Sequence, residues 1–392
     1  MRIAQINAVS GKGSTGKICV GISKILNEQG IDNRIFYSFG SDEYQYAYKY
    51  SNDKYIKFQA LKSRVLGNYG FNSKSATNKL IKYLKEYQPH IVHIHNIHGH
   101  DCDLEMLFTY LKSENIKIVW TFHDCWAFTG YCTYFTLCSC DKWQAGCKNC
   151  PQKGKYSWFC DRSSTLWQKK KELLLGLDLT IVTPSKWLAT LVKESFFRDY
   201  PIEVINNGID LSIFHPAEGD FRKKYACEDK FLLLGVSFEW EVRKGLDVFI
   251  ELAKKLDSKY KIVLVGTNDE VDKLLRSNII SIHRTNNQKE LAEIYSAADL
   301  FVNPTREENF PTVNIESLAC GTPVLTFDTG GSPEIIDSNS GCVIPCDDIE
   351  SMCEKIYQIA KLNQFSSYSC IDRAKHYDMN DKFLEYLRVY AD

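Results

Sequence analysis

Short apolar runs alternate with amphipathic segments along nearly the whole chain. Arg2–Asn7 and Arg34–Phe39 are predicted strands, and the segment between them places Ile18, Ile22 and Leu26 on one face of a helix. This alternation of strands and helices predicts an α/β fold with parallel sheets. Because 392 residues exceed one typical hydrophobic core, we expect two domains.

The most informative stretch is DLFVNPTREENFPTVNIESLACGTP, residues 299–323, which predicts a strand, a loop and a helix. Leu300–Val302 has the composition of a buried parallel strand. Pro311 suits the first turn of the helix, where its missing N–H has no consequence. Gly321 has the position of a helix C-cap glycine. Glu308 therefore precedes the helix, and Glu316 lies in its second turn.

The chemistry of this loop-to-helix turn is that of a nucleotide-sugar pocket. The free N–H groups at a helix N-terminus suit a phosphate, and a carboxylate accepts two sugar hydroxyls at once. In the alternative interpretation, Glu308 is a solvated loop charge and Glu316 is a glutamate favoured by the helix dipole. The spacing of the two glutamates alone does not separate these interpretations.

The E-x7-E pattern followed by SLACGTPV resembles the signature of the retaining GT-B glycosyltransferases of family 4, which include capsule, colanic-acid and lipopolysaccharide enzymes. The resemblance implies two Rossmann-like domains that face each other across a cleft. Residues 1–216 would form the acceptor-binding domain, and residues 217–378 the nucleotide-sugar-binding domain. Residues 379–392 would form a helix that crosses back to the first domain.

The resemblance also implies roles for single residues. Glu316 would hold the ribose, Glu308 the donor sugar and Lys244 the diphosphate. The family usually has a second cation five or six residues before that lysine, where this chain has Phe238 and Glu239, so Arg243 is the substitute that we predict. The full set of predicted donor-binding residues is Gly13, Arg243, Lys244, Glu308, Asn309, Phe310, Pro311, Thr312, Val313 and Glu316.

Histidines follow two predicted strands of the first domain. His123 stands in a T-x-H-D setting, and the resemblance gives it contact with the donor sugar, so that His123 and Glu308 are the predicted catalytic residues. The alternative for His123 is a structural histidine. His93 and His95 share one sheet face because side chains alternate along a strand. They could bind a metal, or they could line the wall of a cleft.

Seven cysteines fall in a predicted insert at residues 125–160. Cys147 and Cys150 form a C-x2-C pair, and Cys132 and Cys140 lie upstream of it. Four thiolates could close a structural zinc site. The alternative is a set of free or packed cysteines, because the upstream spacing is irregular. In either case the role would be structural, and we expect catalysis to need no metal or other cofactor.

Residues 44–85 are rich in lysine and tyrosine, with Asp53 as the one acid before Lys85. Such a surface could rest on anionic lipid headgroups, or it could be a solvated face. The net charge of −1 argues against nucleic acid as a partner. Neither a signal peptide nor a membrane helix is expected, which predicts a cytoplasmic protein. If the lysine- and tyrosine-rich surface binds lipid headgroups, the protein would lie at the inner membrane face.

The function predicted from these features is transfer of a sugar, with hexose favoured, from a nucleotide-diphosphate sugar to a glycan or lipid-linked oligosaccharide in surface polysaccharide biosynthesis. Two other classes remain as alternatives. A non-catalytic nucleotide- or sugar-binding module would share the fold. A P-loop NTPase would use Gly11–Lys17, but Ile18 stands where such a loop needs Ser or Thr for magnesium.

Overall fold

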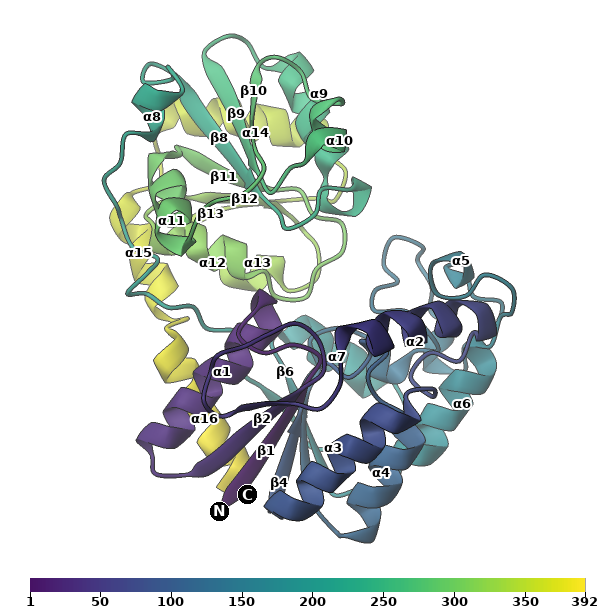
Figure 1. Cartoon of the computed structure of the whole chain (residues 1–392). Coiled ribbons are helices and arrows are strands. Elements are labelled where there is room, and N and C mark those ends of the chain that lie inside the picture. The colour runs from purple at the N-terminus through teal and green to yellow at the C-terminus, as the bar shows by residue number, and fades with distance from the viewer. Residues whose placement is uncertain (392) are drawn as a thin grey trace. The chain divides into compact units, whose positions relative to one another are not determined.

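The computed structural model describes residues 1–391 and divides the chain into two compact α/β units. The first unit comprises residues 1–206 together with the chain from Asn380 onward, and the second comprises Asn207–Met379. Each unit is built on one parallel sheet with helices on both faces (Figure 1). Within the described residues, no helix is both long and apolar enough to cross a membrane.

The first unit has a seven-stranded sheet in the order β3-β2-β1-β4-β5-β6-β7, which is a doubly wound arrangement. Its strands are β1 (Arg2–Asn7), β2 (Asp32–Tyr37), β3 (Ala47–Lys49), β4 (Ile91–Ile94), β5 (Lys117–Thr121), β6 (Leu179–Thr183) and β7 (Ile202–Val204). Its helices are α1 (Gly13–Glu28), α2 (Asp53–Leu66), α3 (Lys74–Tyr87), α4 (Leu104–Ser113), α5 (Lys153–Tyr156), α6 (Ser163–Leu174), α7 (Lys186–Glu194) and α16 (Met379–Ala391).

The second unit has a six-stranded sheet in the order β10-β9-β8-β11-β12-β13. Its strands are β8 (Phe231–Val236), β9 (Tyr260–Val265), β10 (Ile279–Ile282), β11 (Leu300–Asn303), β12 (Val324–Phe327) and β13 (Gly341–Ile344). Its helices are α8 (Phe221–Lys224), α9 (Leu246–Lys255), α10 (Asp269–Asp272), α11 (Gln288–Ala297), α12 (Thr312–Ala319), α13 (Ser332–Ile335), α14 (Ile349–Leu362) and α15 (Ser367–Lys375).

The C-terminal helix α16 packs on the sheet of the first unit beside α1 (Figure 1). Gly21 of α1 is necessary for this packing, because a Cβ atom there would lie 2.3 Å from the Phe383 ring. The Tyr390 hydroxyl lies 2.7 Å from His93 Nδ1, and the Tyr386 hydroxyl lies 3.1 Å from Thr121 Oγ1. One face of the first sheet therefore carries polar side chains that α16 covers.

The boundary between the units lies earlier than the predicted boundary at residue 216. Ile209 forms a β-bridge with Asp378, and the Asn207 side-chain amide donates to the Phe310 carbonyl oxygen over 3.1 Å. These contacts tie residues 207–216 to the second unit. A smaller correction concerns Pro311, which is the N-cap of α12 and not a residue of its first turn.

Candidate active site

The start of α12 forms the centre of the candidate site in the second unit. α12 has no side-chain cap, since its N-cap is Pro311. Its first N–H groups therefore keep the anion-binding character of a helix N-terminus. Gly330 packs so closely over the preceding loop that a Cβ atom there would lie 1.8 Å from the Glu308 carbonyl oxygen. The Gly331 N–H donates to the Asn309 carbonyl over 2.7 Å, which helps to fix the loop.

Lys244 and Glu308 form an ion pair at this point, and both side chains are mostly buried. Burial alone would raise the pKa of the Glu308 carboxyl, but the charge of Lys244 and its hydrogen bond outweigh burial and hold that pKa below its usual value. The carboxylate also accepts from the Asn309 N–H at 3.2 Å. Glu308 is therefore ionised at neutral pH and can accept hydrogen bonds from hydroxyl groups.

Arg243 lies beside this pair. Its Nη1 donates to the Glu307 carbonyl over 3.2 Å, and its Nε pairs with Glu241 at 2.8 Å. Its positive charge contributes to the low pKa of Glu308. The structure thus places the predicted substitute cation next to Lys244, although Arg243 also has a carboxylate partner of its own.

Glu316 faces the buried Tyr295 of α11. The Tyr295 hydroxyl donates to Glu316 Oε2 over 3.2 Å, and this hydrogen bond from the buried side orients the carboxylate. Glu316 itself is only half-buried. Burial first, and then the negative charge of Glu316, raise the pKa of Tyr295, so the phenol stays protonated and remains a donor.

Arg306 holds the loop between β11 and α12, and the sequence analysis did not single it out. Its guanidinium forms two parallel hydrogen bonds with Asp247, of 2.8 and 2.7 Å, and a third with Asp347 of 2.6 Å. The residue is only 8% exposed. Asp247 lies in the first turn of α9, so Arg306 ties the Glu308 loop to the helix that follows Lys244.

The predicted residues of the first unit form a separate histidine network. His123 Nε2 lies 3.1 Å from His95 Nδ1, and His95 Nε2 lies 3.2 Å from Gln5 Oε1. His93 contacts Tyr390 of α16, and both His93 and His95 are buried, so their partners are protein side chains. Burial lowers the pKa of His123 to about 4, although Asp124 opposes this shift, and His123 is therefore neutral at pH 7.

Gly13 also lies in the first unit, where it opens α1 with a φ of 64°. A side chain at this position would be strained, because positive φ favours glycine. The nine other donor-site predictions, from Arg243 to Glu316, all lie in the second unit. The four cysteines predicted to bind zinc, Cys132, Cys140, Cys147 and Cys150, line one small cavity in the first unit.

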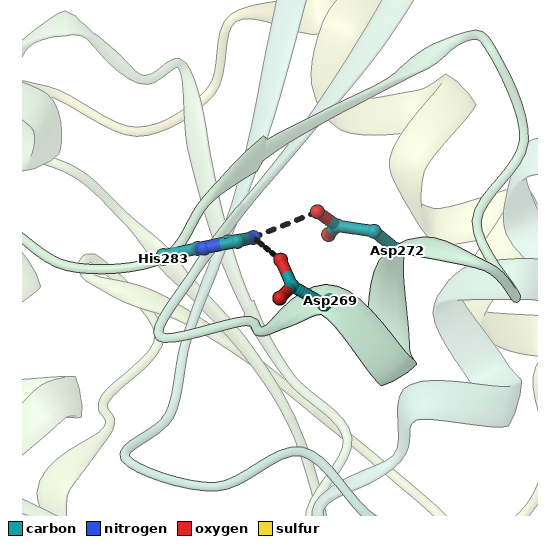
Figure 2. A group of neighbouring side chains, drawn as sticks. All are labelled: Asp269, Asp272 and His283. Carbon is teal, nitrogen blue, oxygen red and sulfur yellow. Dashed lines mark hydrogen bonds and ion pairs between the residues drawn. The ribbon is translucent and has the colours of Figure 1, made fainter.

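A further polar cluster in the second unit consists of Asp269, Asp272 and His283. Figure 2 shows His283 pointing toward both carboxylates, with its Nε2 2.7 Å from Asp272 and 3.9 Å from Asp269. Within residues 1–391, these are the only three His, Cys, Asp or Glu side chains whose potential metal-binding atoms all lie within 4.8 Å of one another. The hydrogen bond that His283 donates to Asp272 raises the pKa of His283, so these side chains form an exposed ion pair. We assign no metal to it.

Comparison with known families decides the identity of the chain. The model of "Glycosyltransferase Family 4" matches residues 16–213, and the model of "Glycosyl transferases group 1" matches residues 228–361. The chain belongs to glycosyltransferase family 4. It is therefore an enzyme that transfers sugar from a nucleotide-sugar donor.

The family 4 relatives differ in how much of the chain they match. A protein named as a colanic acid biosynthesis glycosyl transferase, WcaC of Escherichia coli K12, is 20% identical over 87% of this chain and 86% of its own length. A D-inositol 3-phosphate glycosyltransferase of Streptosporangium roseum is 32% identical, but over only 36% of this chain and 38% of its own length.

Solved structures share the fold of this family 4 chain over its full length. Anabaena HepE in complex with UDP aligns with a TM-score of 0.71 at 14% identity, over 100% of both chains. Sucrose-phosphate synthase from Thermosynechococcus elongatus aligns with a TM-score of 0.71 at 16% identity, over 100% of this chain and 98% of its own. The fold is therefore GT-B, with two Rossmann-like units, as predicted.

Proposed function

We propose that the protein moves a hexosyl group, with retention of configuration, from a nucleoside diphosphate hexose to a hydroxyl of a glycan or lipid-linked oligosaccharide. The observation that carries the proposal is the ion pair of Lys244 with Glu308 at the uncapped start of α12. An ammonium group has three N–H donors, and Glu308 takes one of them. The other two are available to the donor diphosphate.

Different residues of the second unit would bind different parts of the nucleotide-sugar donor. Glu316, oriented by Tyr295, would accept from the ribose hydroxyls. The N–H groups from Asn309 to Val313, with Phe310, Pro311 and Thr312 between them, would line the sugar and its diphosphate. Lys244 and Arg243 would offset the charge that grows on the leaving diphosphate, so the chemistry would need no metal ion.

The transfer step would be a front-face substitution. The acceptor hydroxyl oxygen would form a bond to the anomeric carbon as the bond from that carbon to the diphosphate oxygen breaks. The hydroxyl proton would pass to the leaving phosphate, and no side chain would form a covalent intermediate with the sugar. Glu308 and the neutral His123 would instead hold sugar hydroxyls.

The nucleoside diphosphate is tested by thermal unfolding with UDP, GDP, ADP, CMP and ATP, each with and without magnesium. We expect one diphosphate to stabilise the protein without magnesium, since a ligand at about 100 times its Kd adds about 2.7 kcal/mol. UDP is the first candidate, because HepE was solved in complex with UDP-glucose. Glu316→Ala should weaken binding about 10- to 100-fold, because hydrogen bonds to charged groups contribute about 1.5–3 kcal/mol.

Glu354→Ala is the matched control, since Glu354 is an exposed glutamate of α14 in the same unit. It should bind the nucleotide as the wild type does. Stabilisation by ATP with magnesium alone would contradict the proposal and favour the P-loop hypothesis. Equal binding by the wild type and Glu316→Ala would remove Glu316 from the site.

The acceptor side of the proposal rests on an exposed surface of the first unit. Helix α2 buries Ile56 together with the polar Gln59 and Ser63, and it exposes the apolar Phe58, Leu61 and Val65. Several large apolar side chains exposed together on one helix are unusual for a globular protein. Trp158 and Phe159 are also exposed, and the Trp158 N–H donates to the Arg64 carbonyl at the end of α2.

Lysines surround these exposed apolar side chains, which favours an anionic bilayer as the partner. The exposed basic residues of this membrane-docking surface are Lys54, Lys57, Lys62, Arg64 and Lys155. Aromatic side chains insert at the headgroup level, and each lysine near an anionic surface adds about 1 kcal/mol. We propose that this surface holds the enzyme at the inner membrane face, where a lipid-linked acceptor is presented.

Sedimentation with vesicles of phosphatidylglycerol and phosphatidylcholine tests the membrane contact. Lys54→Ala combined with Lys57→Ala should weaken binding about 30-fold, which is the effect of about 2 kcal/mol. Lys361→Ala, at the exposed end of α14, should have no effect. Wild-type protein that stays in the supernatant at low salt would exclude the bilayer as partner of this surface.

A further inference from the structure

The cysteine-rich insert, residues 125–160, buries large side chains with little regular structure. Its helical segments are Trp126–Phe128, Lys142–Gln144 and the short α5. Tyr131 is fully buried, and Phe135 and Trp143 are nearly so. Segments that lack sheet or long-helix hydrogen bonding often depend on a staple, such as a disulfide or a structural metal. The question is therefore what holds this insert closed.

Four cysteines of the insert surround one cavity of about 20 Å³. They are Cys132, Cys140, Cys147 and Cys150, and the apolar wall includes Tyr131, Phe135 and Trp143. The sulfur atoms of Cys132 and Cys150 lie 3.8 Å apart. Two thiolates that share a tetrahedral zinc ion with bonds of about 2.3 Å stand about 3.8 Å apart as well. The other three cysteines of the insert, Cys125, Cys138 and Cys160, do not line this cavity.

The other two cysteines of the set, Cys140 and Cys147, line the same cavity. Cys147 Sγ accepts a hydrogen bond of 3.2 Å from the Gly130 N–H, an interaction that also suits a thiolate. Among the described residues, no three of these sulfur atoms lie mutually within 4.8 Å. Binding of one ion by all four therefore requires Cys140 or Cys147 to move toward the other pair.

A buried lysine supplies an independent sign of missing negative charge. Lys170 of α6 is fully buried, and its Nζ donates to the carbonyl oxygens of Trp126 and Thr129 over 2.7 and 3.0 Å. The Nζ also lies 3.6 Å from the centroid of the Trp126 ring. None of the ion pairs found in residues 1–391 includes Lys170. Buried charges are normally paired, so an anion close to this ammonium would complete the site.

Lys170 lies beside the cysteine cavity, because Thr129, whose carbonyl oxygen accepts from its Nζ, is one of the residues that line the cavity. Zinc would make the cavity anionic, because a coordinated thiol is deprotonated. A zinc ion with four thiolates carries a net charge of −2, which the Lys170 ammonium partly offsets.

We infer that Cys132, Cys140, Cys147 and Cys150 bind one structural zinc ion, and that Lys170 is the cation beside it. The zinc site holds the insert against α6 and takes no part in sugar transfer. It is independent of the proposed donor-binding site, because all four zinc ligands lie in the first unit, whereas Lys244, Glu308 and Glu316 lie in the second. A disulfide between Cys132 and Cys150 is the competing arrangement, and it would leave Cys140 and Cys147 as free thiols.

The test is the metal content of the full chain, purified without chelators and measured by plasma mass spectrometry. We expect about one zinc per chain, and a fall to below about a tenth in Cys132→Ser and Cys150→Ser. Cys160→Ser is the matched control, because Cys160 belongs to the same insert but is exposed and does not line the cavity. This variant should keep its zinc.

Two measurements on the wild type keep the test decisive if the serine variants do not fold. Titration with a mercurial should release the zinc as thiols are blocked. Replacement by cobalt should give the absorption of a tetrahedral cobalt–thiolate centre. Wild-type protein that lacks bound metal after growth with added zinc would overturn the inference, and so would a Cys132–Cys150 disulfide found by peptide mapping under non-reducing conditions.

Discussion

Replacing Lys244 with methionine is expected to lower kcat/KM for sugar transfer by about 10²- to 10³-fold, the usual effect of removing one group that stabilises transition-state charge. The substitution keeps the length of the side chain and removes its charge. It also leaves Glu308 without its ion-pair partner, in a position where burial raises the pKa of the carboxyl. The measurement is steady-state kinetics with the nucleotide sugar identified by thermal unfolding.

Two further variants separate a role at the diphosphate from a general loss of charge. Lys244→Arg keeps a cation and should recover part of kcat. Lys254→Met removes a lysine of α9 that pairs with Glu251 at the surface, and it should behave as the wild type. An unchanged kcat in Lys244→Met, with the protein folded, would show that another group carries the leaving-group charge.

The second large effect is a loss of stability in mild acid, centred on the first unit. Burial lowers the pKa of His93 to about 3 and that of His123 to about 4, against 6.5 when unfolded, and burial also keeps the pKa of His95 well below 6.5. Each group stabilises the fold fully above pH 6.5 and loses this contribution as the pH falls toward its folded pKa. At pH 5, His93 and His123 should each cost about 2 kcal/mol.

His98 acts in the opposite direction. Burial opposes its charge, but Asp124, at 2.8 Å, outweighs burial and raises the pKa of His98 above 6.5. The stabilisation from this pair is complete below pH 6.5 and is lost as the pH rises through the folded pKa. It reduces the acid effect of the buried histidines without cancelling it, because it is one group against four, since burial also lowers the pKa of His100 to about 4.

Urea unfolding at pH 7.5, 6 and 5, followed by tryptophan fluorescence, measures the acid effect. The signal reports mainly on the first unit, because six of the seven tryptophans lie there and only Trp240 lies in the second. His93→Gln should flatten the pH dependence, whereas His215→Gln, an exposed change in the second unit, should not. A free energy of unfolding that does not change between pH 7.5 and 5 would contradict the prediction.

The sequence predicted the fold well because the periodic signals are local. The strand before Pro304 lies where the apolar pattern indicates, and Gly321, with its positive φ, directly follows Cys320, the C-cap of α12. The predicted donor-binding residues from Lys244 to Glu316 could be identified from the family motif, because their spacing along the chain is part of that motif. Their roles remain proposals, which the binding and kinetic experiments address.

Residues whose partners lie far along the chain were not predictable. Arg306 is one charged residue in a charged loop, and only the fold brings it against Asp247 and Asp347. The contact of Tyr295 with Glu316 likewise depends on α11 packing beside α12. In α2, Phe58, Leu61 and Val65 are exposed, and only the structure reveals that Gln59 and Ser63 are buried instead.

The position of α16 has a consequence for the order in which the chain can fold during synthesis. The second unit is continuous in sequence, from Asn207 to Met379, so its parts are made before α16 is complete. The first unit needs α16, of 13 residues, to cover His93 and Thr121. The unit whose synthesis begins first is therefore completed after the second unit has been made, and until α16 is available its polar sheet face stays open to water and to chaperones.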